Sequence, residues 1–142
     1  MKLVQHVLDA KDGDVISIAR GLSVFDAIKL MADRVVGSLL VMDGGKLVGI
    51  VTERDYARKV ILKGRSSETT SVEEIMTTEV LTATAVQTVN ECMTLMTEKR
   101  IRHLPIVEED KVIGIISIGD LVQAIISDQR EEIEQLENYI SG

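Results

Sequence analysis

The stretch Gly49-Ile50-Val51-Thr52-Glu53-Arg54-Asp55 recurs 65 residues later as Gly114-Ile115-Ile116-Ser117-Ile118-Gly119-Asp120. Each copy places a glycine in an apolar run typical of a strand, then a hydroxyl residue, then an aspartate at the start of an expected helix. Sliding the chain by the same interval aligns its two halves without a gap, so that Val24 falls on Val89 and Met31 on Met96. The sequence therefore indicates an internal repeat.

Each copy predicts the same order of elements. A short extended piece comes first, and a helix follows that opens with a capping box, Ser23-x-x-Asp26 or Thr88-x-x-Glu91. Two apolar runs then form a hairpin, and a second helix begins near Asp55 or Asp120. We expect an α/β fold of the α+β type, with two β-α-β-β-α repeats related by a pseudo-two-fold axis. The expected extended segments are 14–18, 38–42 and 47–51 in the first copy and 79–83, 104–107 and 112–116 in the second, with four-residue hairpin connections in both.

Polar stretches and amphipathic spacing predict the domain bounds. The first repeat spans residues 5–63, a polar linker 64–72, the second repeat 73–127, and a C-terminal amphipathic helix 128–142. We expect that helix to dock on its own domain or on a partner subunit. Short helices are expected at 3–8 and 70–76, each leading into the repeat that follows it.

Composition excludes several classes of protein. The 142 residues are 45% hydrophobic and 27% charged, as in a soluble globular protein. A net charge of −7 argues against nucleic acid as a partner. The single cysteine cannot form an internal disulfide, and no apolar run has the length of a signal peptide core or a membrane span. We therefore expect a cytoplasmic protein without a membrane partner.

Catalytic and metal-binding groups are not recognisable. Cys92 lies on the apolar stripe of a predicted helix and is interpreted as a core residue. His6 and His103 have no cysteine or acidic partner at the spacing of a zinc site or a catalytic triad, and the carboxylates form no acid/base pair. We predict no catalytic residue, no metal, no catalytic cofactor and no enzyme activity.

Two interpretations of the repeated Thr/Ser-x-x-Asp motif stay open. A hydroxyl residue three positions before an acid is a capping box, which stabilises a helix and does nothing else. The same helix start also offers N–H groups to a phosphate, and its carboxylate can accept hydrogen bonds from a ribose diol. Because the motif occurs twice after glycine-containing strands, we favour a ligand.

The paired Gly-containing strings, with Arg102-His103-Leu104-Pro105-Ile106-Val107 ahead of the second, resemble the tandem CBS domain family, named after cystathionine β-synthase. The likeness covers about residues 5–126, and the stretch 51–59 is similar to stand-alone bacterial and plant-organelle members that bind adenylates. The resemblance implies a module with two clefts between its repeats that senses energy or metabolite status. It implies AMP, ADP, ATP or NAD as ligand, ranked ahead of S-adenosylmethionine, a homodimer, and an unknown regulated protein on a separate chain. The alternative is a structural protein–protein dimerisation module without a nucleotide.

The resemblance also implies which residues contact the ligand. The aspartate of each motif would hold ribose hydroxyls, the threonine or serine would reach ribose or phosphate, and apolar side chains would enclose the adenine. The first predicted site consists of Thr52, Arg54, Asp55, Arg58, Leu81, Thr82, Ile101, Arg102 and His103. The second consists of Ile16, Ser17, Val36, Gly37, Ser38, Ser117 and Asp120.

Charge distinguishes the two predicted sites. Cationic side chains gather only around the first, namely Arg54, Arg58, Lys59, Arg102 and His103. We therefore predict the Asp55 site as the better phosphate site, and a nucleoside-rich ligand, a weaker one or none at Asp120. A solvated helix face is the alternative interpretation of the cluster. For the homodimer we expect exposed apolar positions on the second helices at Val60, Ile61, Ile125 and Ile126.

Overall fold

A computed structural model describes residues 2–11 and 15–141, which divide into two compact units. The first-repeat unit consists of residues 15–80. The second-repeat unit joins the N-terminal segment to the residues from Leu81 onward. Both units contain the predicted mixture of helices and strands, so the α+β expectation is confirmed. Asp14, the predicted start of the first extended segment, lies outside the described residues.

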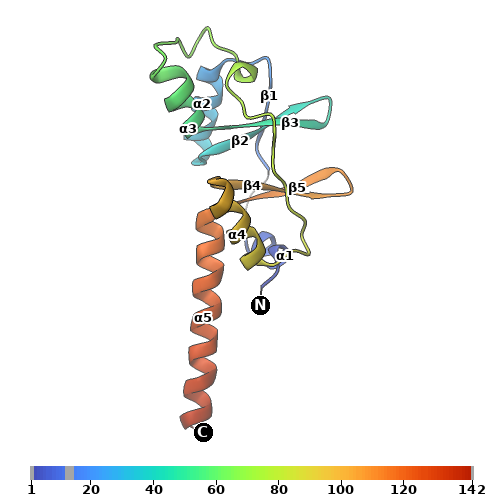
Figure 1. Cartoon of the computed structure of the whole chain (residues 1–142), viewed down its shortest axis with the longest axis vertical. Helices are drawn as coiled ribbons and strands as arrows, with labels where there is room; N and C mark the ends of the chain where they lie inside the picture. The colour runs from blue at the N-terminus through green and yellow to red at the C-terminus, as the bar shows by residue number, and fades with distance from the viewer. Residues whose placement is uncertain (1, 12–14, 142) are drawn as a thin grey trace. The chain divides into compact units, whose positions relative to one another are not determined.

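The first-repeat unit is built on a three-stranded sheet in the order β1-β2-β3, with β1 parallel and β3 antiparallel to β2 (Figure 1). Strand β3 runs directly into helix α3, so its last residue, Thr52, caps that helix. Its elements are β1 Ser17–Ala19, α2 Val24–Arg34, β2 Ser38–Asp43, β3 Lys46–Thr52, α3 Glu53–Tyr56 with a π-helical continuation Ala57–Ile61, and a 3-10 turn Val72–Glu74.

The second-repeat unit has a sheet of two strands among its described residues, β4 and β5. The predicted extended segment 79–83 is wrong as a strand: only Ala83 pairs, in a single parallel bridge to Ile106. The elements of this unit are α1 Val4–Ala10, α4 Val89–Lys99, β4 His103–Glu108, β5 Lys111–Ser117 and α5 Ile118–Ser141.

Both hairpins turn more tightly than predicted. Two residues connect the strands, Gly44-Gly45 in the first and Glu109-Asp110 in the second, in place of the four expected. All four residues have positive φ, as a two-residue turn between twisted strands requires. The outer two residues of each expected connection extend the strands.

The short segment that precedes each repeat packs into the unit of the other repeat. Helix α1 packs into the second-repeat unit, where Leu3 bridges Thr88. The 3-10 turn Val72–Glu74 packs into the first-repeat unit, where Ser71 bridges Ser23. The prediction that each segment leads into the repeat after it is therefore wrong, because the apolar faces of both segments are covered by the other repeat.

The segment 64–72, predicted as a linker, lies within the first-repeat unit. The N–H of Val24 donates to the carbonyl of Thr70 at 2.8 Å, and the N–H of Phe25 donates to the carbonyl of Ser67 at 2.9 Å. These bonds satisfy donors at the start of helix α2, which have no partner inside the helix.

The predicted helix stripes form the cores. In α2 the stripe is buried at Val24, Ala27 and Met31, and in α4 the equivalent positions are also buried, including Cys92. Val60, expected as an exposed position for dimerisation, is fully buried in the core of its unit, so that expectation is wrong.

Helix α5 is continuous over 24 residues, so the second helix of the repeat and the predicted tail are one element. Its buried residues are Leu121 and Ala124, and residues 129–141 are all exposed. In Figure 1 this part extends away from β4 and β5, so the tail does not dock on its own domain. None of the described helices is long and apolar enough to cross a membrane.

Candidate functional site

The Thr52–Asp55 motif forms a closed set of hydrogen bonds at the start of α3. The hydroxyl of Thr52 accepts the N–H of Asp55 at 3.1 Å. The carboxylate oxygen Asp55 Oδ2 accepts the N–H of Thr52 at 3.0 Å and its hydroxyl at 3.1 Å. This arrangement is a capping box, and it orients the carboxylate of Asp55 beside the end of strand β3.

Lys59 completes the surroundings of Asp55. Its ammonium lies 3.1 Å from Asp55 Oδ1, one helical turn away, and donates to the carbonyl oxygen of Ile75 at 2.7 Å. Both carboxylate oxygens of Asp55 thus have donors from the protein, and its side chain is only 11% exposed. The lysine compensates the charge of a carboxylate that has lost most of its water.

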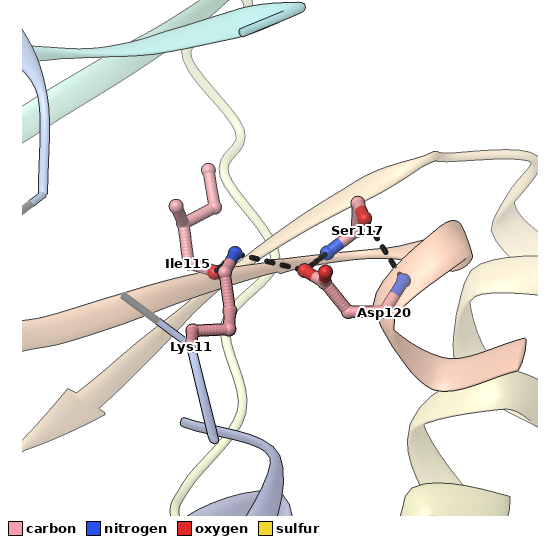
Figure 2. Close-up of polar contacts among 4 residues, drawn as sticks. All are labelled: Lys11, Ile115, Ser117 and Asp120. Atoms are coloured by element: carbon pink, nitrogen blue, oxygen red, sulfur yellow. Dashed lines mark hydrogen bonds and ion pairs between the residues drawn. The ribbon is translucent and has the colours of Figure 1, made fainter. Parts of the chain in front are cut away.

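The Ser117–Asp120 motif repeats this geometry in the second-repeat unit. The hydroxyl of Ser117 accepts the N–H of Asp120 at 3.1 Å, and Asp120 Oδ2 accepts the N–H of Ser117 at 2.8 Å. Figure 2 shows a second donor to this carboxylate, the ammonium of Lys11, which lies 2.8 Å from Asp120 Oδ2 and donates to the carbonyl of Ile115 at 2.7 Å.

These contacts keep Asp120 ionised. Partial burial raises the pKa of this carboxyl, but the hydrogen bonds from Lys11 and from the N–H of Ser117, with the charge of Lys11, outweigh it. The net pKa of Asp120 lies below its ordinary value. Near neutral pH the motif therefore presents a carboxylate, which can only accept hydrogen bonds.

The other predicted residues are distributed between the two units. In the first-repeat unit, Gly37 accepts the N–H of Glu53 at 3.1 Å and Ser38 pairs with Thr52, so the 36–38 segment lies beside the Asp55 motif. In the second-repeat unit, the carbonyl of Arg102 accepts the N–H of Ile118 at 2.9 Å, and His103 pairs with Ser117. Arg102 and His103, assigned by sequence to the Asp55 site, thus lie beside the Asp120 motif within their own unit.

The remaining predicted side chains differ in exposure. Arg54 and Arg58, four residues apart on the helical segment after Thr52, are both exposed. Ser17, Leu81 and Thr82 are exposed, whereas Ile16, Val36 and Ile101 are half-buried.

The repeated glycines are explained by packing. A Cβ at Gly49 would lie 2.6 Å from Met76 Sδ and 3.0 Å from the carbonyl oxygen of Thr77. A Cβ at Gly114 would lie 2.6 Å from Leu8 Cδ2. In both units the glycine lets a segment from outside the repeat, α1 or the residues after the 3-10 turn, pack closely on the strand that carries the motif.

Sequence analysis did not identify Lys11 as part of a site. Its partner is 109 positions away, and it precedes the first repeat while packing with the second. Within the residues that the structure describes, no three His, Cys, Asp or Glu side chains are grouped as a metal site would require.

Comparison with known proteins gives a consistent result over most of the chain. The family model described as "CBS domain" matches residues 7–62 and again 72–127. The chain is 46% identical over 125 residues to the CBS domain-containing protein CBSX3, mitochondrial, of Arabidopsis thaliana, which covers 84% of this chain and 61% of that protein. The chain thus spans about three fifths of the length of this relative.

Solved structures also share the fold, and two of them bear on the function. A protein of Burkholderia ambifaria MC40-6, named for signal transduction and for its CBS domains, has a TM-score of 0.87 and 52% sequence identity, and the match covers 90% of this chain and 96% of that one. The CBS domain pair of protein MJ0100, solved with 5′-methylthioadenosine and S-adenosyl-L-methionine, has a TM-score of 0.78 at 28% identity, with 89% of this chain and 98% of that one covered.

Proposed function

The chain belongs to the CBS domain family, a family of signal-transduction and regulatory modules, and from that premise we propose that it binds an adenine nucleotide and regulates a separate protein. The proposed ligand is AMP, ADP, ATP or NAD, with S-adenosylmethionine next in order. We propose that the chain itself forms a cytoplasmic homodimer and has no catalytic activity.

One observation carries this proposal: the same hydroxyl–aspartate geometry ends a glycine-containing strand in both units. Asp55 and Asp120 each accept the N–H of the motif's first residue, and each has a lysine ammonium within 3.1 Å. A helix cap needs only the hydroxyl and one N–H. A partly buried carboxylate that is also charge-compensated in both copies suits the recognition of a diol, which donates two hydrogen bonds.

Two further facts support an adenosine-containing ligand. The related CBS domain pair of MJ0100 was solved with two such compounds. The exposed Arg54 and Arg58 near Asp55 add positive charge to a chain with a net charge of −7, as phosphate binding would need. We propose as ligand contacts the residue sets that the sequence predicted, with Asp55 and Asp120 on ribose.

A signal requires that the nucleotide bind two arrangements of the protein with different affinity. The proposed effect on a partner is such a shift. The first test concerns the ligand.

Isothermal titration calorimetry with AMP, ADP, ATP and NAD tests the proposal. We expect micromolar binding of at least one of them, weakened at least about tenfold in Asp55→Ala because charge-assisted hydrogen bonds to ribose are lost. The matched control is Asp26→Ala. Asp26 also follows a hydroxyl residue by three positions and donates its N–H to that hydroxyl at 3.1 Å, but it opens α2 and is in neither predicted site.

Binding that survives in Asp26→Ala and weakens in Asp55→Ala would support the proposal. If the wild type binds none of the four nucleotides and also fails with S-adenosylmethionine, the structural dimerisation module is the better account. Equal weakening in both variants would show that the motif acts only as a helix cap.

A further inference from the structure

Lys11 reaches the Asp120 motif from outside the repeat that contains it. It follows helix α1, and its ammonium bonds to Asp120 Oδ2 and to the carbonyl of Ile115 (Figure 2). The side chains of Lys11 and Asp120 are 35% and 26% exposed, so solvent and ligands have access to the pair.

Packing fixes the place of Lys11. Val4 and Val7 of α1 are buried in the core of the second-repeat unit. Leu8 approaches Gly114 so closely that a Cβ there would lie 2.6 Å from its side chain. Ile115 follows Gly114 in β5, and Lys11 lies within one helical turn of Leu8. The contact of Leu8 with Gly114 therefore brings Lys11 to the carbonyl of Ile115. The buried side chains of α1 thus determine where Lys11 lies, and its ion pair with Asp120 follows from that packing.

The two units obtain their lysines from unrelated positions. The position that corresponds to Lys59 in the second repeat is Ala124. Ser23 and Thr88 occupy the same place in the two repeats. Because Leu3 bridges Thr88 and Ser71 bridges Ser23, Leu3 is the counterpart of Ser71. By the same count along the chain, the counterpart of Lys11 is Glu79. The two lysines thus occupy positions of the repeat that are not equivalent, yet each bonds the motif carboxylate and one main-chain carbonyl.

Stabilisation of the fold is a weak explanation for this recurrence at Asp120. An ion pair as exposed as this one contributes about 0–1 kcal/mol. An ammonium has three donors, and toward the described residues Lys11 directs two of them, to Ile115 and Asp120. In the part of the chain that the structure describes, the ammonium of Lys11 and the N–H of Ser117 both donate to Oδ2 of Asp120, whereas at Asp55 donors reach both oxygens.

We propose that Lys11 and Asp120 together form a nucleoside-phosphate site, in which Asp120 Oδ1 accepts ribose hydroxyls and the third donor of Lys11 binds the phosphate. The proposal rests on the proposed function, and it replaces the expectation of a nucleoside-rich or empty Asp120 site. The ligand class is a nucleoside 5′-phosphate, and the neutral nucleoside is its natural comparison.

Calorimetry with AMP and adenosine in an Asp55→Asn background isolates the Asp120 site. We expect AMP to bind there, and Lys11→Met to weaken AMP about tenfold while changing adenosine by less than about twofold. Lys2→Met is the matched control: it removes the same charge from the same unit, and Lys2 pairs with Asp128 at 3.4 Å, away from the motif. Far-UV circular dichroism checks that each variant folds. If Asp55→Asn does not fold, Lys11→Met and Lys2→Met are compared in the otherwise unchanged chain, with isotherms fitted to two sites.

Each other outcome overturns the inference. Equal weakening of AMP and adenosine would make Lys11 a positioning residue for Asp120. Tighter AMP binding in Lys11→Met would make it a competitor of the ligand. AMP binding by the wild type but not by folded Asp55→Asn would remove the Asp120 site and leave the proposed function intact, whereas no nucleotide binding by the wild type would remove both.

Discussion

The close approach of Met76 and Thr77 to Gly49 allows a quantitative prediction about how this segment packs on strand β3. Alanine at this position would place a Cβ 2.6 Å from Met76 Sδ and 3.0 Å from the carbonyl oxygen of Thr77. The thioether can move, but the carbonyl cannot, because Thr77 exchanges two hydrogen bonds with Ile50, at 2.9 and 3.0 Å. The backbone of the docked segment must therefore shift.

The cost follows from two opposing effects. Overpacking a core costs about 1–3 kcal/mol, and replacing glycine by alanine at an unstrained position recovers about 0.4–1 kcal/mol from the unfolded state. We expect Gly49→Ala to lower the free energy of unfolding by about 1–2 kcal/mol.

Gly114→Ala is the matched comparison. The three atoms nearest to its Cβ, at 2.6, 3.4 and 3.5 Å, all belong to the side chain of Leu8, which can change rotamer. The two effects nearly cancel there, and we expect a change within about 0.5 kcal/mol. The two substitutions are chemically identical and occupy the same position of the repeated motif, and at both sites the nearest atoms belong to a flexible side chain, so the Thr77 carbonyl is the rigid group that only Gly49 approaches among its three nearest atoms.

Urea unfolding followed by far-UV circular dichroism measures both variants, since the chain has no tryptophan. A neutral Gly49→Ala, or equal losses in both variants, would refute the reasoning that the Thr77 carbonyl and not the side chain limits space at this strand.

Three further predictions concern titration, reactivity and the tail. The pKa of Asp120 is lowered in the folded state, so its contribution to stability is present above the unfolded pKa of about 4 and is lost as the pH falls through the lowered value. Lys11→Met should therefore cost up to about 1 kcal/mol at pH 7 and progressively less below about pH 4, and a constant difference in urea titrations at both pH values would contradict this. Burial raises the pKa of the Cys92 thiol, and the residue is fully buried, so iodoacetamide should alkylate it at least about a hundredfold more slowly than in the urea-unfolded chain. Because residues 129–141 are exposed, a variant that ends at Asp128 should keep its free energy of unfolding within about 0.5 kcal/mol while losing helical signal, and a larger loss would show that the tail packs in solution.

Local patterns in the sequence predicted most of the fold. The apolar stripes of α2 and α4, with Val24 and Val89 at equivalent places, follow from helical periodicity. The hairpins follow from pairs of apolar runs separated by short polar stretches. The second turn was predicted too long because Glu109 and Asp110 are not the glycines or asparagines that usually indicate positive φ, although the backbone adopts it there. The first turn was also predicted too long, although Gly44-Gly45 is a pair typical of a two-residue turn.

The doubled hydroxyl–aspartate motif was also evident from sequence, and its capping geometry follows from residues three positions apart. At the Asp55 motif the chain contains its own cation, since Lys59 is one turn away on the same helix. Local spacing is sufficient in such cases because the covalent chain already holds the groups near each other.

Only the tertiary structure decided which segment docks on which repeat and which cation serves Asp120. Helix α1 and the 3-10 turn Val72–Glu74 each bury their apolar residues in the unit of the other repeat, and this exchange places Lys11 against a carboxylate 109 positions away. Contacts of this kind leave no period or spacing in the sequence, because burial of apolar area is non-directional and does not depend on chain order. The strands, helices and motif were therefore determined by local sequence, and the electrostatic surroundings of the second aspartate by the packing of Leu8 on Gly114.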